Sequence, residues 1–454
     1  MKKIISLVLC LCLLITALPL SASADENFDG AYDAIVKGVL AFDERIYIDQ
    51  YNISTADFSE LFNVIVANEP LLFNMKMCYY GSSGTKVTYM RPEYVMTQEE
   101  YNEAMVFVNA EVEAILATIP EGLDDYETAL YLHDYIALNF CYDLTYTIRT
   151  IYDFLKEKTG VCAAYTFLYD ELLTRIGIEN YAVRCQSLNH VWNEIKINGN
   201  WYHVDITWDD PVGSTTDVTD KGYYARAWHD DFLCSDDKIF ATHATDIVTK
   251  YACTDKSFDN LSWKNSYYPV GFANGNVYVL NDDNISLLDI KTDNTTAVFD
   301  ADYEMHRSEI NGRYYMNLPY FGSYDNKLIY HNGESILAFD PLALTAKTLE
   351  TPVTDNKITL LYVSGNTVNY IIGTSDTKAE GEFKTLLLTK GLAGDIDGNG
   401  ELSALDYIML KRAVMSGIEL SVSQDIWDVN ADELFSLLDY ITLKRVVMGT
   451  YVLN

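Results

Sequence analysis

A thiol, an imidazole and a carboxylate follow one another in the middle of the chain, as Cys162, His190 and Asp205. Cys162 directly precedes an apolar run with helical spacing, and Gly177 closes this run as a helix C-cap would. The run consists of Tyr165, Leu168, Tyr169, Leu172 and Ile176. Cys162 is therefore expected in the first turn of a helix, where unpaired backbone amides favour a thiolate over a thiol.

His190 and Asp205 are expected on the two strands of a hairpin, because the Asn-Gly pair at 198–199 is a strong signal for a two-residue turn. With this turn, Trp192 opposes Asp205 and His190 opposes Thr207. His190, Trp192 and Asp205 then share one face, and the diagonal from His190 to Asp205 spans about 7–8 Å, within reach of an imidazole and a carboxylate. The other face is expected to be core and carries Val191, Ile195, Ile197, Val204 and Ile206.

This arrangement is what a cysteine nucleophile requires. The histidine takes the proton of the thiol, and the aspartate fixes the tautomer of the histidine and stabilises the imidazolium that forms. His203 lies on the same face and is a second candidate for the base, although it is nearer the turn. The alternative is a buried structural cysteine among ordinary strand residues, but the joint pattern of Cys162, His190 and Asp205 favours a catalytic site.

Three separated motifs resemble the transglutaminase-like, papain-related core of bacterial secreted proteins. They are Gly160-Val161-Cys162, His190-Val191-Trp192-Asn193 and the segment 201–211, which begins at Trp201 and ends at Pro211. The resemblance covers about Tyr126 to Asp236 and departs at Ala163-Ala164, where relatives often carry Gln and Gly. It implies an α+β core. The site residues that it implies are a triad of Cys162, His190 and Asp205, with Tyr142 and Trp192 as oxyanion or substrate contacts.

The C-terminal part of the chain contains an internal repeat. The segment 395–400 returns at 428–433, and each copy leads into Leu-Asp-Tyr and then Leu-Lys-Arg. Side-chain oxygens fall at positions 1, 3, 5, 9 and 12 of each loop, with a carbonyl at position 7, which is the oxygen spacing of an EF-hand loop and suits calcium. A solvated acidic loop is the alternative, but the duplication with a common helix favours metal binding. The predicted calcium ligands are Asp395, Asp397, Asn399, Glu401 and Asp406 in the first loop, and Asp428, Asn430, Asp432, Leu434 and Asp439 in the second.

The duplicated loop and helix resemble dockerin modules, over about Gly394 to Gly449. The resemblance implies two calcium sites and, as partner, a cohesin module on the scaffold of a polysaccharide-degrading complex (a cellulosome). Ala404-Leu405 and Leu437-Leu438, with the Lys-Arg pairs that follow them, are the expected cohesin-facing positions. Glu433 stands where glycine normally takes the sharp turn of the loop, so the second site is expected to bind calcium more weakly.

Other features of the sequence indicate a secreted protein. Residues 1–24 have the lysines, apolar stretch and final small residues of a signal peptide, with an uncleaved membrane anchor as the alternative. The formal charge of −34 argues against nucleic acid or an anionic membrane as partner. If Cys162 is the nucleophile, an odd number of cysteines remains in the mature chain, which gives no complete disulfide framework. No zinc spacing is evident, so catalysis is expected to need no cofactor.

The chain is expected to divide into five parts. These are the signal peptide (1–24), an N-terminal α/β region (25–122), the transglutaminase-like core (123–255), a β-rich domain (256–390) and the dockerin (391–454). The N-terminal region has helical spacing at 58–66 and 101–116 and a short strand at 86–90. In the β-rich domain, short strands at 276–280, 326–330 and 366–370 follow turn residues, which indicates either a β-sandwich or blade-like repeats.

The first hypothesis for function is an extracellular cysteine peptidase or acyltransferase that acts on amide bonds of proteins or peptides and that a cohesin scaffold can hold at the cell surface. Hydrolysis and acyl transfer share one acyl-enzyme, and hydrolysis is favoured because water is abundant outside the cell. Two other hypotheses stay open. One is a non-catalytic binding or structural subunit with an unused triad. The other is a hydrolase of polysaccharide catabolism, which would need two facing carboxylates that no pattern in so acidic a chain singles out.

Overall fold

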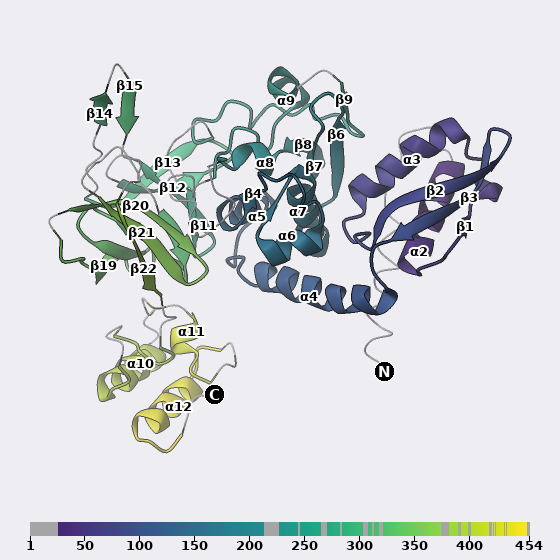
Figure 1. Ribbon diagram of the computed structural model, residues 1–454. Helices are drawn as coiled ribbons and strands as arrows, with labels where there is room; N and C mark the ends of the chain where they lie inside the picture. The colour runs from purple at the N-terminus through teal and green to yellow at the C-terminus, as the bar shows by residue number, and fades with distance from the viewer. Residues whose placement is uncertain are drawn as a thin grey trace. The chain divides into compact units, whose positions relative to one another are not determined.

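The computed structural model divides the chain into two compact units, residues 1–109 and 110–454, and each is described by itself (Figure 1). It describes residues 26–212, 227–243, 246–264, 270–281, 284–302, 307–310, 313–316, 321–354, 356–373, 381–388, 392–397, 401–416, 420, 422, 424–430, 432 and 434–451. The expected signal peptide lies outside these ranges. Within them, no helix combines the length and the apolar character that crossing a membrane requires.

The first unit packs helices against a small antiparallel sheet with the strand order β1-β3-β2. Its elements are α2 (Glu26–Leu40), β1 (Ile46–Tyr47), the 3-10 helix η2 (Asp49–Tyr51), α3 (Thr55–Asn68), β2 (Met75–Ser83) and β3 (Lys86–Tyr94), and α4 (Gln98–Leu116) follows. Ser54 starts α3, because its hydroxyl oxygen accepts the backbone N–H of Asp57 at 3.1 Å. The buried core includes Ile35, Leu61 and Met90. The predicted helices at 58–66 and 101–116 and the predicted strand at 86–90 are all present.

Helices and a short parallel strand pair open the second unit. Helix α5 (Asp125–Asn139) begins with a capping box, in which the side chains of Asp124 and Glu127 each accept the other's backbone N–H. Strand β4 (Cys141–Tyr142) pairs in parallel with β5 (Thr159–Gly160), and α6 (Ile151–Glu157) lies between them in the chain. Helix α7 (Cys162–Ile176) follows β5 directly and ends at Gly177, whose φ is 86°. The helix predicted to begin near Cys162 is therefore confirmed.

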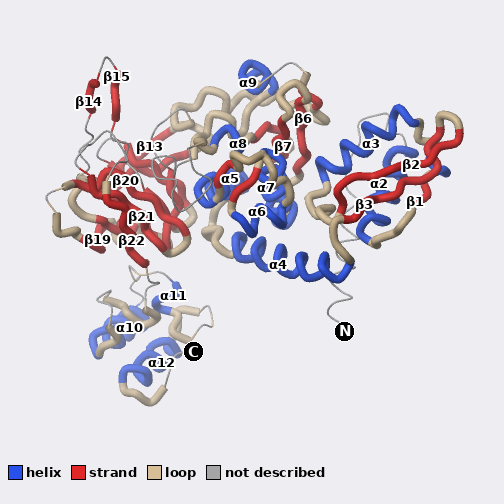
Figure 2. The backbone as a smooth tube through the Cα atoms, in the orientation of Figure 1, coloured by secondary structure: helices blue, strands red, loops and turns tan. Residues whose placement is uncertain are grey.

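A four-stranded antiparallel sheet with the order β8-β7-β6-β9 packs against α7 (Figure 2). Its strands are β6 (Asn180–Cys185), β7 (His190–Ile197), β8 (Asn200–Val204) and β9 (Ile247–Val248). Asn198 and Gly199 have φ of 50° and 85°, as a type I′ turn requires, and Ile197 pairs with Asn200, which is the predicted register. The predicted pairing of His190 with Thr207 is wrong, because Thr207 lies in helix α8 (Ile206–Asp209).

The β-rich region consists of antiparallel sheets whose strands follow the order of the chain. The first sheet contains β10 (Val270–Ala273), β11 (Asn276–Asn281), β12 (Asn284–Asp289) and β13 (Asn294–Asp300). The second contains β16 (Phe321–Tyr324), β17 (Lys327–His331), β18 (Ile336–Asp340) and β19 (Thr345–Glu350). The third contains β20 (Lys357–Ser364), β21 (Thr367–Gly373) and β22 (Glu382–Leu387), and β14 (Arg307–Ile310) and β15 (Arg313–Met316) form a separate pair.

The arrangement of these sheets matches blade-like repeats rather than a β-sandwich. The first strands β10, β16 and β20 are neighbours, and one apolar core lies between each sheet and the next. The three strands predicted from the sequence are β11, β17 and β21, and each is the second strand of its sheet. The strands that recur along the sequence therefore mark one structural unit each, and this unit is a sheet.

The C-terminal region is small and helical. It contains α10 (Ala404–Ser416), α11 (Gln424–Trp427) and α12 (Leu437–Val447), and α10 packs on α12. Each of these two helices follows one copy of the repeated acidic loop. The core between them is small, and its buried members are Ile396, Leu410, Ile426, Val429 and Leu443, with partly buried apolar side chains packed around them. The observed fold class is thus the predicted one, an α+β core followed by a β-rich region and a helical C-terminal module.

Candidate active site

Cys162 is the first residue of α7 and is 9% exposed. No side chain caps this helix, and the N–H of Ala164 in its first turn donates to the carbonyl of Val161 at 2.8 Å. Gly160 is packed closely between α6 and the first turn of α7. A Cβ at this position would lie 2.6 Å from the Phe154 ring and 2.7 Å from the Ala164 methyl group. The hydroxyl of Thr166 donates to the carbonyl of Cys162 at 2.9 Å and fixes the first turn.

His190 begins strand β7 and joins the thiol to the carboxylate. Its Nε2 lies 2.5 Å from Oδ2 of Asp205, and Cys162 lies close enough to its ring to raise its pKa. Because Nε2 faces Asp205, Nδ1 is the nitrogen left for the sulfur. Burial lowers the pKa of His190, but the charge and hydrogen bond of Asp205 and the contact with Cys162 raise it overall, to about 10. The arrangement therefore favours an imidazolium next to Cys162.

Asp205 is fully buried and caps helix α8. Its Oδ1 accepts the backbone N–H of Trp208 at 3.2 Å. Burial alone would raise the pKa of Asp205, but the neighbouring histidines His190 and His243 hold it well below its usual range. The strand β8 ends at Val204 because Asp205 turns its side chain back to start a helix, which places the carboxylate next to His190.

Trp192 and His203 form a buried layer behind His190. The Trp192 ring stacks on the His190 ring, with centroids 5.5 Å apart, and its Nε1–H donates to Nδ1 of His203 at 3.1 Å. The other nitrogen of His203 lies 3.0 Å from Oδ1 of Asp236. An indole N–H can only donate, so Nδ1 of His203 accepts and Nε2 carries the proton. Burial lowers the pKa of His203, so this second candidate for the base is a neutral residue with both nitrogens engaged.

Tyr142 lies on strand β4 and pairs with Gly160, two positions before Cys162. Burial raises the pKa of its hydroxyl, as does the nearby Cys162, to about 12, so the hydroxyl keeps its proton and can donate it. The next residue, Asp143, fixes the loop that follows. Its carboxylate accepts backbone N–H groups of Thr145, Thr147 and Ile148 at 2.7–2.9 Å. Tyr142 is thereby held at the side of Cys162.

Two side chains in the site were not singled out from the sequence. His243 follows helix α9 (Asp236–Thr242), and its Nε2 lies 3.0 Å from Oδ2 of Asp205. The Trp208 ring stacks on His243 with centroids 3.9 Å apart and lies 6.0 Å from the His190 ring. Trp208 belongs to the motif at 201–211, which also contains Asp205, so the sequence does indicate that it lies near the site. No local pattern marks His243.

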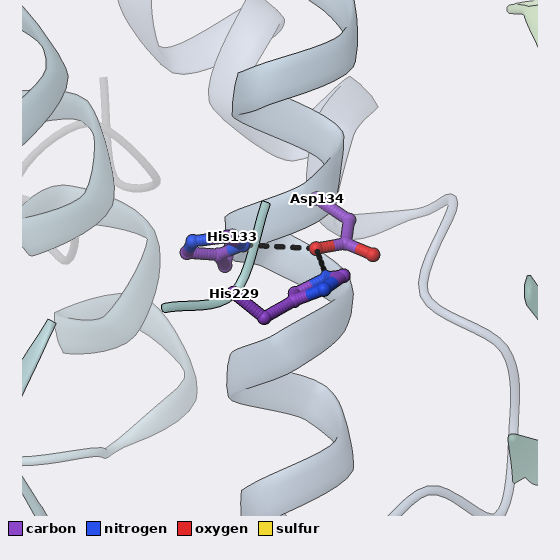
Figure 3. Close-up of side chains that lie close together, drawn as sticks. All are labelled: His133, Asp134 and His229. Carbon is purple, nitrogen blue, oxygen red and sulfur yellow. Dashed lines mark hydrogen bonds and ion pairs between the residues drawn. The ribbon is translucent and has the colours of Figure 1, made fainter. Parts of the chain in front are cut away.

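A second buried cluster fixes the helix that Asp205 caps. His133 Nδ1 and His229 Nε2 lie 2.8 and 2.9 Å from the same oxygen of Asp134 (Figure 3). His133 Nε2 also lies 3.1 Å from Asp209, the last residue of α8. Burial lowers the pKa of His133, but the two carboxylates raise it overall, to about 9. Both ring nitrogens of His133 thus face carboxylates, and this cluster ties α5 to the end of α8.

Glu194 is a buried carboxyl group on the same face of β7 as His190 and Trp192. It is 0% exposed, and only its Oε2 has a hydrogen-bond donor, the N–H of Tyr251 at 3.3 Å, whereas Oε1 has none. Burial raises its pKa to about 8, and the nearby Asp236 contributes to the rise. An unfolded glutamate ionises above about pH 4.3, so between these values the folded state holds a proton that the unfolded chain releases. The free energy of unfolding must therefore fall as the pH rises through this range.

The variant Glu194→Gln is expected to raise the free energy of unfolding at about pH 8 and to change it little at about pH 5. The gain is on the order of 1.4 kcal/mol for each unit by which the pKa is raised, because the amide carries no charge to bury. Thermal unfolding at both pH values measures it. Glu179→Gln is the matched control, since Glu179 is an exposed partner of Lys196 on the same sheet. An equal gain from Glu194→Gln at both pH values would contradict the argument.

The acidic loops before α10 and α12 each bring carboxylates together. Oxygens of Asp395, Asp397 and Asp406 lie within 4.8 Å of one another, and so do oxygens of Asp428, Asp432 and Asp439. Oδ1 of Asp439 is buried without a hydrogen-bond partner, which suits it to bind a cation. These all-oxygen sets suit calcium. The other predicted ligands Glu401, Asn430 and Leu434 lie in the same loops, whereas Asn399 and Glu433 lie outside the described residues.

The fold and the site define a protein with a transglutaminase-like, papain-related core and a dockerin at its C-terminal end. Comparison with known families agrees, because the transglutaminase-like superfamily matches residues 115–206 and the dockerin type I domain matches residues 393–448. The chain thus contains one domain of each kind. Dockerin type I domains bind calcium, so the C-terminal module is a calcium-binding one.

Two solved structures show limited similarity to the chain. One is a TGase, with 10% sequence identity and a TM-score of 0.22, over 32% of this chain and 47% of that chain. The other is a candidate cysteine protease from Cytophaga hutchinsonii, with 23% identity and a TM-score of 0.19, over 23% of this chain and 37% of that chain. The chain thus spans less than half the length of either structure. No curated protein matches it.

Proposed function

We propose that the protein is an extracellular cysteine enzyme that acts on amide bonds of proteins or peptides. The observation that supports this most is that His190 lies 2.5 Å from the Asp205 carboxylate and has Cys162, the first residue of a helix, close to its ring. Each member has the environment that its role needs. Asp205 is buried and favours its ionised form, His190 favours its protonated form, and Cys162 is the first residue of a helix.

In the proposed reaction the Cys162 thiolate attacks the amide carbonyl carbon. In this proposal the oxyanion that forms is held by the backbone N–H of Cys162, and the Tyr142 hydroxyl donates a second hydrogen bond. His190 gives its proton to the leaving amine as the C–N bond breaks, which leaves a thioester on Cys162. An incoming water or amine then gives its proton to His190 as it displaces the sulfur. Trp192 acts here as a support for His190, because its polar atom is already bound to His203.

Water and an amine compete for the thioester, and we favour hydrolysis because water is abundant outside the cell. The C-terminal module is proposed to bind two calcium ions and a cohesin on a scaffold protein. Leu405, Leu437 and Leu438 support this docking face, because they are 52%, 50% and 55% exposed on the two helices that follow the calcium loops. Such docking would place the enzyme beside the scaffold, outside the cell.

A product screen tests the proposed activity. The full chain and its Cys162→Ala variant are each incubated with a mixed library of peptides, proteins and cell-wall peptides, and the products are identified by mass spectrometry. New termini, or new cross-links to added amines, that need Cys162 are the expected result, and they also separate hydrolysis from acyl transfer. Identical product sets from both proteins would overturn the proposal and leave a non-catalytic subunit. Polysaccharide fragments that appear without Cys162 would point to carbohydrate cleavage instead.

A further inference from the structure

The Asp205 carboxylate accepts hydrogen bonds from two histidines, His190 and His243. A catalytic triad uses only the first of them. Its Oδ2 lies 2.5 Å from Nε2 of His190 and 3.0 Å from Nε2 of His243. The side chains of Asp205 and His243 are fully buried. The backbone N–H of Trp208 donates to Oδ1, so the carboxylate has three N–H donors. These hydrogen bonds offset the free-energy cost of burying its charge.

The hydrogen bonds of His243 show which of its nitrogens donates to Asp205. An ionised carboxylate only accepts, so Nε2 of His243 carries a proton and donates it to Asp205. Nδ1 of His243 lies 2.9 Å from the hydroxyl of Thr242, which serves as its partner in turn. Both ring nitrogens are therefore engaged, and His243 is not placed to exchange a proton with Cys162. Any effect that it has on the thiol must pass through Asp205 and His190.

The surroundings of His243 hold its ring in one orientation. One side stacks on Trp208 at 3.9 Å with an interplanar angle of 19°, and the Trp192 ring lies 4.9 Å away. The helix before it, α9, is anchored at its start, where Asp236 binds Nε2 of His203 at 3.0 Å and accepts the N–H of Cys253 at 3.2 Å. Trp192 and His203, which lie behind His190, are thus connected through Asp236 and α9 to His243, the second partner of Asp205.

We propose that His243 is a positioning residue of this site, which fixes the Asp205 carboxylate so that Asp205 can hold His190 in its reactive orientation. The inference rests on the proposed function of Cys162 and adds a residue from outside the recognised motifs. Without the His243 donor, Asp205 keeps a single side-chain partner in a buried position, is protonated more easily and loses a fixed orientation. His190 would then stabilise the Cys162 thiolate less well.

Alkylation of Cys162 in the full chain tests this without a known substrate. His243→Phe keeps a ring to stack on Trp208 but has no donor, whereas His243→Gln carries an N–H near the position of Nε2. With iodoacetamide at mildly acidic pH, His243→Phe is expected to slow the alkylation of Cys162 about tenfold, and His243→Gln is expected to restore most of the rate. The acidic limb of the rate profile should move to higher pH in His243→Phe alone. The ionisable groups that face Asp205 are His190, His243, His203 and Asp231.

The outcomes separate this inference from the proposed function. A wild-type Cys162 that reacts no faster than Cys78 or Cys185 would overturn the proposed nucleophile itself. A reactive wild-type Cys162 with an unchanged rate and profile in His243→Phe would overturn only the role of His243. Equal slowing by both variants would also overturn it, because a loss of packing rather than of the donor would then be the cause. Melting curves check that each variant is folded.

Discussion

An Asp205→Asn variant is expected to stay folded and to lose about 10⁴-fold in turnover, the loss that the same exchange causes in a serine protease triad. The reason lies in how the carboxylate is used. Oδ2 accepts the N–H groups of His190 and His243, and Oδ1 accepts the backbone N–H of Trp208. Both oxygens are thus acceptors, whereas an amide offers one acceptor oxygen and one donor NH₂ group.

Either orientation of the new amide brings two donors face to face. If the amide oxygen still accepts from His190 and His243, the NH₂ group faces the backbone N–H of Trp208. If it turns round, the NH₂ group meets His190 and His243, and His190 must then carry its proton on Nδ1, which faces Cys162. In that tautomer His190 cannot take the thiol proton and does not stabilise the thiolate.

Two measurements check this expectation, the turnover of a peptide identified by the product screen and the rate at which iodoacetamide alkylates Cys162. Asp236→Asn is the matched control. Asp236 accepts from His203 just as Asp205 accepts from His190, but it reaches the site only indirectly, through Trp192 and through helix α9, and should cost far less. Near-normal turnover by Asp205→Asn would mean that another residue orients His190.

Much of the site could be predicted from the sequence because it depends on local rules. Cys162 begins a helix because an apolar run of helical spacing follows it, and the hairpin register follows from the turn at 198–199. The strands β11, β17 and β21 were recognised because each follows turn residues and has a strand-like pattern. What these patterns could not provide was the order of strands within each sheet, which decides between a sandwich and blades.

The rest of the site depends on contacts between distant segments. The alternation of residue types from Trp201 to Trp208 predicts one strand, but the strand ends at Val204. The side chain of Asp205 caps helix α8 and binds two histidines instead of continuing the strand. His243 lies beyond helix α9 with no periodic pattern around it. Trp192 was expected to touch oxyanion or substrate, yet its N–H is bound by His203, a partner that only the folded sheet brings into reach.

Calcium removal is expected to unfold the C-terminal module and to leave the reactivity of Cys162 unchanged. The core between α10 and α12 is too small to stabilise the module alone, and each loop holds three carboxylates within 4.8 Å of one another. Their repulsion must be offset by a cation, so binding and folding are coupled. At a calcium concentration of about 100 times Kd, each site adds about 2.7 kcal/mol to the free energy of unfolding. Cohesin binding should be lost together with the helices.

The two proposed calcium sites are expected to differ in affinity. The first loop carries Gly400 where an EF-hand loop turns sharply, whereas the second carries Glu433, whose side chain makes that turn costly. Calorimetric titration of the full chain should therefore resolve two binding events. Asp395→Ala should remove the tighter event and Asp428→Ala the weaker one, while Glu433→Gly should strengthen the weaker site. A single event, or two equal ones in the unaltered chain, would contradict the role assigned to Glu433, and a change in Cys162 alkylation on chelation would contradict the independence of the two sites.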